Sequence, residues 1–194
     1  MGPNGKTWCH VPDSGFLMPS AIHLGFIVKG YPGSGRRIES ESDLSLVSGP
    51  DLIQGAFMGD AVIKLGNDDF STRFGWVTLL DWCLRISSAA RTMASTTSSH
   101  FRFSESDDFL SFRRDSDKLF VACSYSPGVA VASYIEFAKA VRDFVDEQLS
   151  WISTNYPSAM MNPEMRVVLA GVDQVVGGGV EGFGELDHDV DGGA

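Results

Sequence analysis

The sequence contains few cysteines and no long hydrophobic run. Its three cysteines, Cys9, Cys83 and Cys123, are widely spaced and include no C-x-x-C pair, so neither a disulfide framework nor a cysteine-rich zinc site is indicated. The apolar stretch 21–28 is too short to span a bilayer and has no basic region before it. We therefore expect a reduced, cytoplasmic setting and no membrane anchor.

Basic residues are also scarce. The chain has 15 Lys and Arg against 25 Asp and Glu, a formal net charge of −10, which repels phosphate backbones and anionic lipids. We expect no nucleic-acid or membrane partner, whereas a basic protein partner would be attracted. Residues 172–194 contain no Lys or Arg but six acidic residues: Asp173, Glu181, Glu185, Asp187, Asp189 and Asp191.

Motifs that identify catalysis or cofactors are missing. There is no G-x-S-x-G elbow, and Gly2 to Thr7 ends like a phosphate-binding loop but lacks its leading glycine. Cys9 and His10 are adjacent, yet no partner stands at metal-site spacing. The sequence therefore predicts no cofactor, no metal and no catalytic residues.

Ser133 to Tyr156 has the clearest periodic pattern and predicts one long amphipathic helix. Ser133 and Glu136 have capping-box spacing at its start, and Pro157 is expected to end it. Its apolar stripe is made of Tyr134, Phe137, Ala138, Val141, Phe144, Val145, Leu149 and Ile152.

A second amphipathic helix is predicted with an apolar face running from Trp76 to Met93, ending in the Ser/Thr cluster 95–99. The stretch 101–132 then predicts a meander of four strands. Its Phe101, Phe103 and Phe112 alternate with arginines, as in single-stranded nucleic-acid binders. Core phenylalanines with outward arginines are the favoured alternative at this net charge.

The rest of the chain predicts shorter elements. Strands are expected near 21–28, over 37–47 and from Phe57 to Leu65, with turns around Pro32 and at 48–51. Asn162 and Pro163 predict an N-cap and a first helical position, and Gly171 a helix end.

These elements predict an irregular arm at 1–20, a single domain at 21–171 and an acidic, Gly-rich tail at 172–194. The predicted fold is α+β, with an antiparallel sheet of about five to seven strands covered by two main helices and a short C-terminal helix. Oligomeric state and strand order are left open.

Gln148 falls within the apolar stripe of the long helix. A buried amide needs partners, so it either bonds a loop backbone or marks a groove left open for a ligand. The second alternative predicts a pocket near Tyr134, Gln148 and Trp151. For a basic protein partner, the predicted contacts are Asp187, Asp189 and Asp191 in the tail.

The segment FLSFRRDSDKLFVACSY, followed by a capped helix ending in NYP, resembles small uncharacterised bacterial proteins, some grouped with the immunity proteins of toxin systems. The resemblance covers residues 70–157. It implies an acidic, cytoplasmic α+β protein that masks a charged toxin site. We thus expect a non-enzymatic protein-binding module. The alternatives are a small-molecule-binding or enzymatic α+β domain with its pocket between sheet and helices, and a subunit of a larger assembly that uses exposed aromatic residues of the N-terminal arm.

Overall fold

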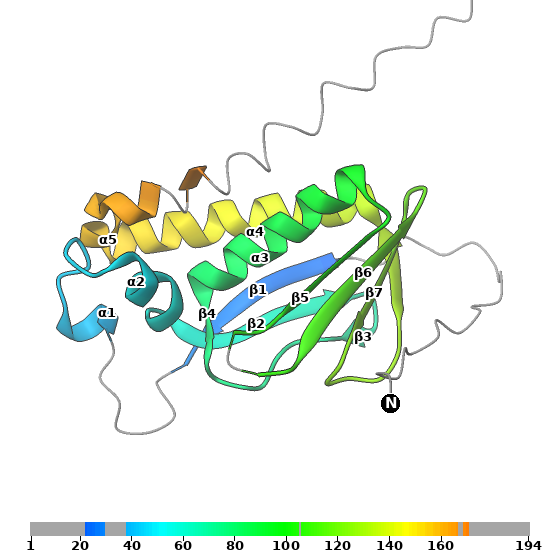
Figure 1. Cartoon of the computed structure of the whole chain (residues 1–194), viewed down its shortest axis with the longest axis horizontal. Coiled ribbons are helices and arrows are strands. Elements are labelled where there is room, and N and C mark those ends of the chain that lie inside the picture. The colour runs from blue at the N-terminus through cyan, green and yellow to red at the C-terminus, as the bar shows by residue number, and fades with distance from the viewer. Residues whose placement is uncertain (1–21, 30–37, 105, 167–168, 171–194) are drawn as a thin grey trace, which may run out of the picture.

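The structure, a computed structural model, describes residues 22–29, 38–104, 106–166 and 169–170 (Figure 1). These residues form two four-stranded antiparallel sheets, two main helices and several short helices. The predicted α+β class is confirmed. The arm at 1–20 and the tail, with Asp187, Asp189 and Asp191, lie outside the described residues.

The first sheet has the order β1-β2-β3, with β1 at Ile22–Val28, β2 at Met58–Leu65 and β3 at Asp68–Asp69. A short β4, Val77–Thr78, pairs with the beginning of β2. Leu24 stands opposite Ile63 across the β1–β2 pair. The strands predicted near 21–28 and 57–65 are confirmed.

The second sheet is the predicted meander. It has the order β5-β6-β7-β8, with β5 at Ser98–Arg102, β6 at Phe109–Asp115, β7 at Lys118–Cys123 and β8 at Ala130–Ser133. The prediction of a single sheet is wrong. Between β4 and β5 the chain passes through α3, Leu79–Ser95, whose 17 residues span about 25 Å. This distance lets β5 start a separate sheet.

Helices α3 and α4 lie together along one side of the molecule and contact both sheets (Figure 1). The helix α4, Tyr134–Asn155, confirms the predicted long helix, and the hydroxyl of its N-cap Ser133 accepts a hydrogen bond of 3.3 Å from the N–H of Glu136. The predicted stripe is buried at Phe137, Val141 and Phe144. Helix α3 begins at Leu79, three residues after the predicted Trp76.

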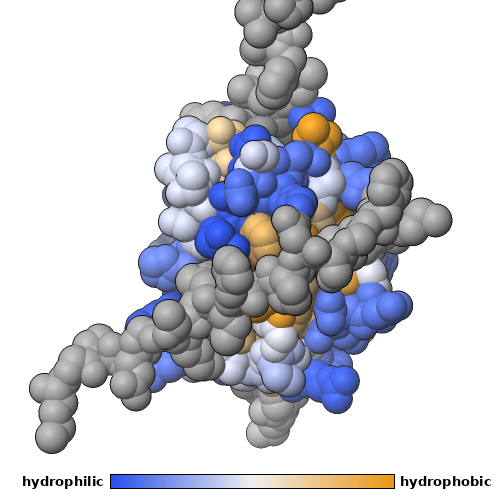
Figure 2. All heavy atoms as spheres, turned by 90° about the vertical axis from the view of Figure 1, so that its right-hand side faces the viewer, coloured by the Kyte–Doolittle hydropathy of each residue, from blue (hydrophilic) through white to orange (hydrophobic). Residues whose placement is uncertain are grey.

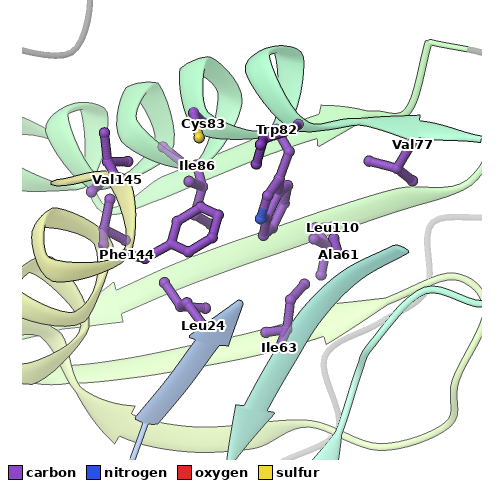
Figure 3. Packing of buried hydrophobic residues seen from close by; sticks show 14 of the residues in the cluster. Leu24, Ala61, Ile63, Val77, Trp82, Cys83, Ile86, Leu110, Phe144 and Val145 are labelled. Carbon is purple, nitrogen blue, oxygen red and sulfur yellow. The ribbon is translucent and has the colours of Figure 1, made fainter. Parts of the chain in front are cut away.

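One continuous core lies between the two helices and the inner faces of both sheets (Figure 3). Trp82 and Ile86 of α3 and Phe144 of α4 point toward Leu24 and Ile63 of the first sheet. The ring centroids of Trp82 and Phe144 are 6.5 Å apart. Burial of these large side chains supplies most of the driving force for folding.

Two predictions for residues 37–51 are wrong. The stretch predicted as a strand contains α1, Ile38–Glu41, followed by bends and turns, and the predicted turn at 48–51 is the beginning of α2, Gly49–Gly55. Ser48 is the N-cap of α2, and its hydroxyl accepts a hydrogen bond from the N–H of Asp51. Ser followed by Pro is typical of a helix start as well as of a turn.

The last described residues pack against the segment that joins α1 and α2. Pro157 ends α4 and begins α5, Pro157–Met161. Asn162 is the predicted cap, since its side-chain oxygen accepts a hydrogen bond from the N–H of Glu164, and residues 163–166 are helical. Its amide nitrogen donates to the carbonyl oxygens of Leu44 and Val47. Within the described ranges, no helix is both long and apolar enough to cross a membrane.

Candidate functional site

The outer face of the first sheet carries the candidate site. Leu24 and Ile63 face the helices (Figure 3). Because side chains alternate along a strand, their neighbours on β1 and β2 point to the opposite face of the sheet. The register aligns His23 with Lys64, Gly25 with Val62 and Ile27 with Asp60. On the other edge of β2, Asp69 stands opposite Lys64.

This face is hollowed over Gly25. The hollow has a volume of about 570 Å³, within the range of small-molecule sites. It is lined by three strands and one helix: His23, Leu24, Gly25, Phe26, Ile27, Lys29, Asp60, Val62, Lys64, Asp69, Ser71, Thr72, Arg73, Glu147 and Gln148. We call it the β1–β2–β3 hollow.

Glycine at position 25 is not required by the backbone. A Cβ placed there would lie 3.4 Å from the Cβ of Val62 and 3.6 Å from Nε2 of His23, ordinary contact distances, and the residue does not have a positive φ. Glycine weakens a strand interior, and it often marks close approach of a ligand or another backbone. Here its absent side chain leaves the floor of the hollow open.

Asp60 stabilises one end of the hollow. It is 3% exposed, forms an ion pair with Lys29, and accepts a 2.7 Å hydrogen bond from the N–H of Gly75. The hydroxyl of Thr72 lies 3.5 Å from the same carboxylate oxygen. Asp60 therefore holds the segment after β3 against β2, and both of its oxygens already have partners within the protein.

The other charged groups of the hollow are exposed. Asp69 accepts a hydrogen bond from the N–H of Ser71. Hydrogen bonding from Ser71, first through its side chain and then through its backbone, lowers the pKa of Asp69, and nearby Lys64 and Arg73 lower it further. Lys64 and Arg73 form no ion pair with any described residue.

The hollow reaches past the edge strand β1 to the neighbouring helix α4, which contributes Glu147 and Gln148 to its lining. Gln148 is half-buried, and its amide makes no hydrogen bond to a described residue, whereas Asn155 and Asn162 both bond backbone carbonyls. Gln148 therefore lines the hollow, and its role in ligand binding stays a prediction.

The other two residues predicted to share a pocket with Gln148 lie elsewhere. The hydroxyl of Tyr134 donates a 3.0 Å hydrogen bond to the carbonyl oxygen of Ala90, and the guanidinium of Arg114 lies 4.0 Å from its ring centroid. Trp151 packs edge-on against Phe57 at 5.9 Å. Both residues therefore have a structural role, and neither lines the β1–β2–β3 hollow.

The three phenylalanines that alternate with arginines, Phe101, Phe103 and Phe112, face the core. Phe103 and Phe112 are buried, and Phe101 packs on the core. Arg102 points outward and is largely exposed. This confirms the alternative of core phenylalanines. In Figure 2, hydrophilic side chains make up most of the visible described surface, with hydrophobic ones in small patches.

The two described cysteines, Cys83 and Cys123, are both buried. Burial raises the pKa of the Cys83 thiol, and burial also raises the pKa of Cys123 and of Tyr125. A thiol must ionise to act as a nucleophile or a metal ligand. Among the residues the structure describes, no three His, Cys, Asp or Glu side chains are placed to hold a metal ion.

Comparison of this chain with protein-family models, with curated proteins and with solved structures found no match.

Proposed function

We propose that this protein is a binding protein for a small molecule, and that the β1–β2–β3 hollow is its site. The observation that carries the proposal is an open hollow of about 570 Å³ whose floor is a glycine that the strand does not need. Small-molecule sites combine a concave apolar floor with a few polar groups that orient the ligand. Here Gly25 and Val62 supply the floor, and His23, Lys64 and Gln148 supply polar groups.

The arrangement supports binding more than catalysis. Asp60 is the most buried acid of the hollow, and its oxygens are occupied by Lys29 and Gly75. A general base must instead be free to reach a proton on the substrate. The exposed groups of the hollow can orient a ligand through charge and hydrogen bonding, and we assign no reaction to them.

A thermal-shift screen of metabolites tests this function. A ligand that binds only the native state at about 100 times its Kd adds about 2.7 kcal/mol, which raises the melting temperature of a chain this size by about 5–10 °C. Gly25→Val covers the floor of the hollow and should weaken or abolish the shift. Ala122→Val, on the outward face of β7 in the second sheet, adds bulk elsewhere and should retain it.

Two results would contradict the proposal. One is a screen in which no compound stabilises the protein. The other is a stabilising compound whose effect is the same in Gly25→Val as in the wild type, because its site must then lie outside the hollow.

As a second candidate function, we propose binding to a basic protein partner, as expected of an immunity-type protein. The net charge of −10 supports it, since charge of one sign accelerates encounter with the opposite sign. Asp187, Asp189 and Asp191 would contribute mainly to the association rate. Pull-down followed by kinetics tests this. The association rate should fall as salt rises, and deletion of residues 177–194 should slow association more than it speeds dissociation.

A further inference from the structure

We infer that the β1–β2–β3 hollow binds a small organic anion, such as a carboxylate or a phosphate ester with an apolar body. The inference rests on the proposed function and specifies its ligand. Some charged groups of the hollow already have partners in the protein, and others have none. Those that have none determine the ligand charge.

Two of the three acidic groups of the hollow, Asp60 and Asp69, have partners within the protein. Asp60 is paired with Lys29 and bonded by the N–H of Gly75. Asp69 accepts the N–H of Ser71 and is further stabilised as a carboxylate by Lys64 and Arg73. Neither acid therefore needs a cationic ligand.

Two of the three basic side chains of the hollow lack such a close partner. Lys64 and Arg73 lie within 4.0 Å of no described carboxylate. Lys64 stands opposite Asp69 in the β2–β3 pair, and Arg73 lies in the segment between Thr72 and Gly75 that Asp60 holds. An anion between them could accept charge-assisted hydrogen bonds from both.

Two further polar side chains reinforce this polarity. Nε2 of His23 lies 3.6 Å from the position that a Gly25 Cβ would take, so the imidazole borders the floor. The Gln148 amide stands on the α4 wall without a hydrogen bond to a described residue, and its NH₂ can donate to an anion. Val62 and the half-exposed Ile27 offer apolar surface for the ligand body.

Glu147 opposes the anion from the same wall. This exposed carboxylate has no partner among the described residues. The inference therefore predicts that Glu147→Gln strengthens anion binding. A site built for a cation would weaken under the same substitution, so the variant separates the two possibilities.

Three ring compounds of matched shape test the inference: benzoate, benzamide and benzylamine. Each is titrated into the full chain, and the amide NMR signals of Gly25, Val62 and Gln148 are followed. Benzoate should bind most tightly. Lys64→Ala or Arg73→Ala should weaken it by about two- to fivefold each, as expected for exposed charges. Lys139→Ala is the matched control, because Lys139 is paired with Asp143 on the exposed side of α4, and it should bind benzoate like the wild type.

The net charge of −10 makes the test stringent, since non-specific attraction favours benzylamine over benzoate. If benzamide or benzylamine shifts the hollow signals at equal or lower concentration than benzoate, the anion inference is overturned while the binding site stands. If none of the three shifts these signals at concentrations on the order of 10 mM, where even weak ligands with Kd near 1 mM are bound, the site and the inference both fall.

Discussion

The hydroxyl of Tyr125 donates a 2.9 Å hydrogen bond to the carbonyl oxygen of Phe70, 55 residues earlier in the chain. Tyr125 follows β7 of the second sheet, and Phe70 follows β3 of the first. Among the described residues, no strand of one sheet pairs with a strand of the other. The bond therefore joins the two sheets through a side chain. It also fixes the segment that carries Ser71 and Arg73 into the hollow.

Tyr125→Phe should lower the free energy of unfolding by about 1–3 kcal/mol, because the carbonyl of Phe70 loses its donor while the ring packing is kept. Urea denaturation measures the loss. Tyr134→Phe, which removes the bond to Ala90 on the other side of the molecule, is the comparison. An unchanged stability in Tyr125→Phe would mean that water replaces the hydroxyl and that the bond does not hold the sheets together.

Gly25 and Gly59 should respond to alanine in opposite ways. At Gly25 the new methyl group meets its neighbours at ordinary distances, so Gly25→Ala should be neutral or slightly stabilising through the lower entropy of the unfolded chain. At Gly59 the Cβ would lie 2.0 Å from the carbonyl oxygen of Ile27, so the two strands must separate. Thermal melting should show a large loss for Gly59→Ala alone. An equal loss at both sites would contradict the open floor of the hollow.

Phe144→Ala should cost about 3–5 kcal/mol, because the ring is buried against Trp82 and its removal leaves a cavity. Leu46→Ala is the control. Leu46 is 83% exposed, and its truncation should change stability by no more than about 0.5 kcal/mol. Chemical denaturation of both variants checks the prediction. A small effect at Phe144 would show that the inner face of α4 is not in the core.

Asp60→Ala should destabilise the protein by about 1.5–3 kcal/mol, since the N–H of Gly75 loses a charged acceptor in a buried position. Asp60→Asn keeps an oxygen for that N–H and should lose less. The two values come from urea denaturation of each variant. Equal losses in both would indicate that the ion pair with Lys29, and not the bond to Gly75, is what stabilises this segment.

Because of Cys83, we expect the free energy of unfolding to fall at alkaline pH. Burial raises the pKa of its thiol above the ordinary value of 9.0, so above this pH the unfolded chain releases the proton while the folded chain keeps it. The contribution of Cys83 is thus fully present below pH 9 and is lost as pH rises. Cys83→Ala should flatten the pH dependence of the free energy of unfolding above pH 9. Thiol labelling of the native wild type should leave Cys83 unmodified. Rapid labelling under native conditions would contradict its burial.

The long helix and the meander could be predicted because each depends on neighbours in sequence. The apolar stripe of α4 and the cap at Ser133 are local signals, and the strands from Phe109 to Ser133 are joined by short turns. The split into two sheets could not be predicted in the same way. The pairing of Leu24 with Ile63 joins segments separated by about 30 residues, and no local pattern identifies such partners.

The candidate site was only partly visible in the sequence. Gln148 stood out as an amide within an apolar stripe. His23 and Lys64 come from separate strands and Arg73 from the segment between β3 and β4, and each alone resembles an ordinary exposed residue. The one local signal that was missed is Gly25, a glycine inside a strand-like run, which often indicates a close approach of a ligand.

The two hydrogen bonds from Asn162 to the carbonyl oxygens of Leu44 and Val47 span more than 110 residues of sequence. During synthesis, the corner formed by α1 and α2 therefore cannot acquire these bonds until residue 162 has left the ribosome. Contacts of such long sequence separation form slowly, because a large loop must close first. The residues of this corner are therefore synthesised early but reach their final hydrogen bonding late. A nascent chain that ends before residue 162 exposes the corner to proteases and chaperones.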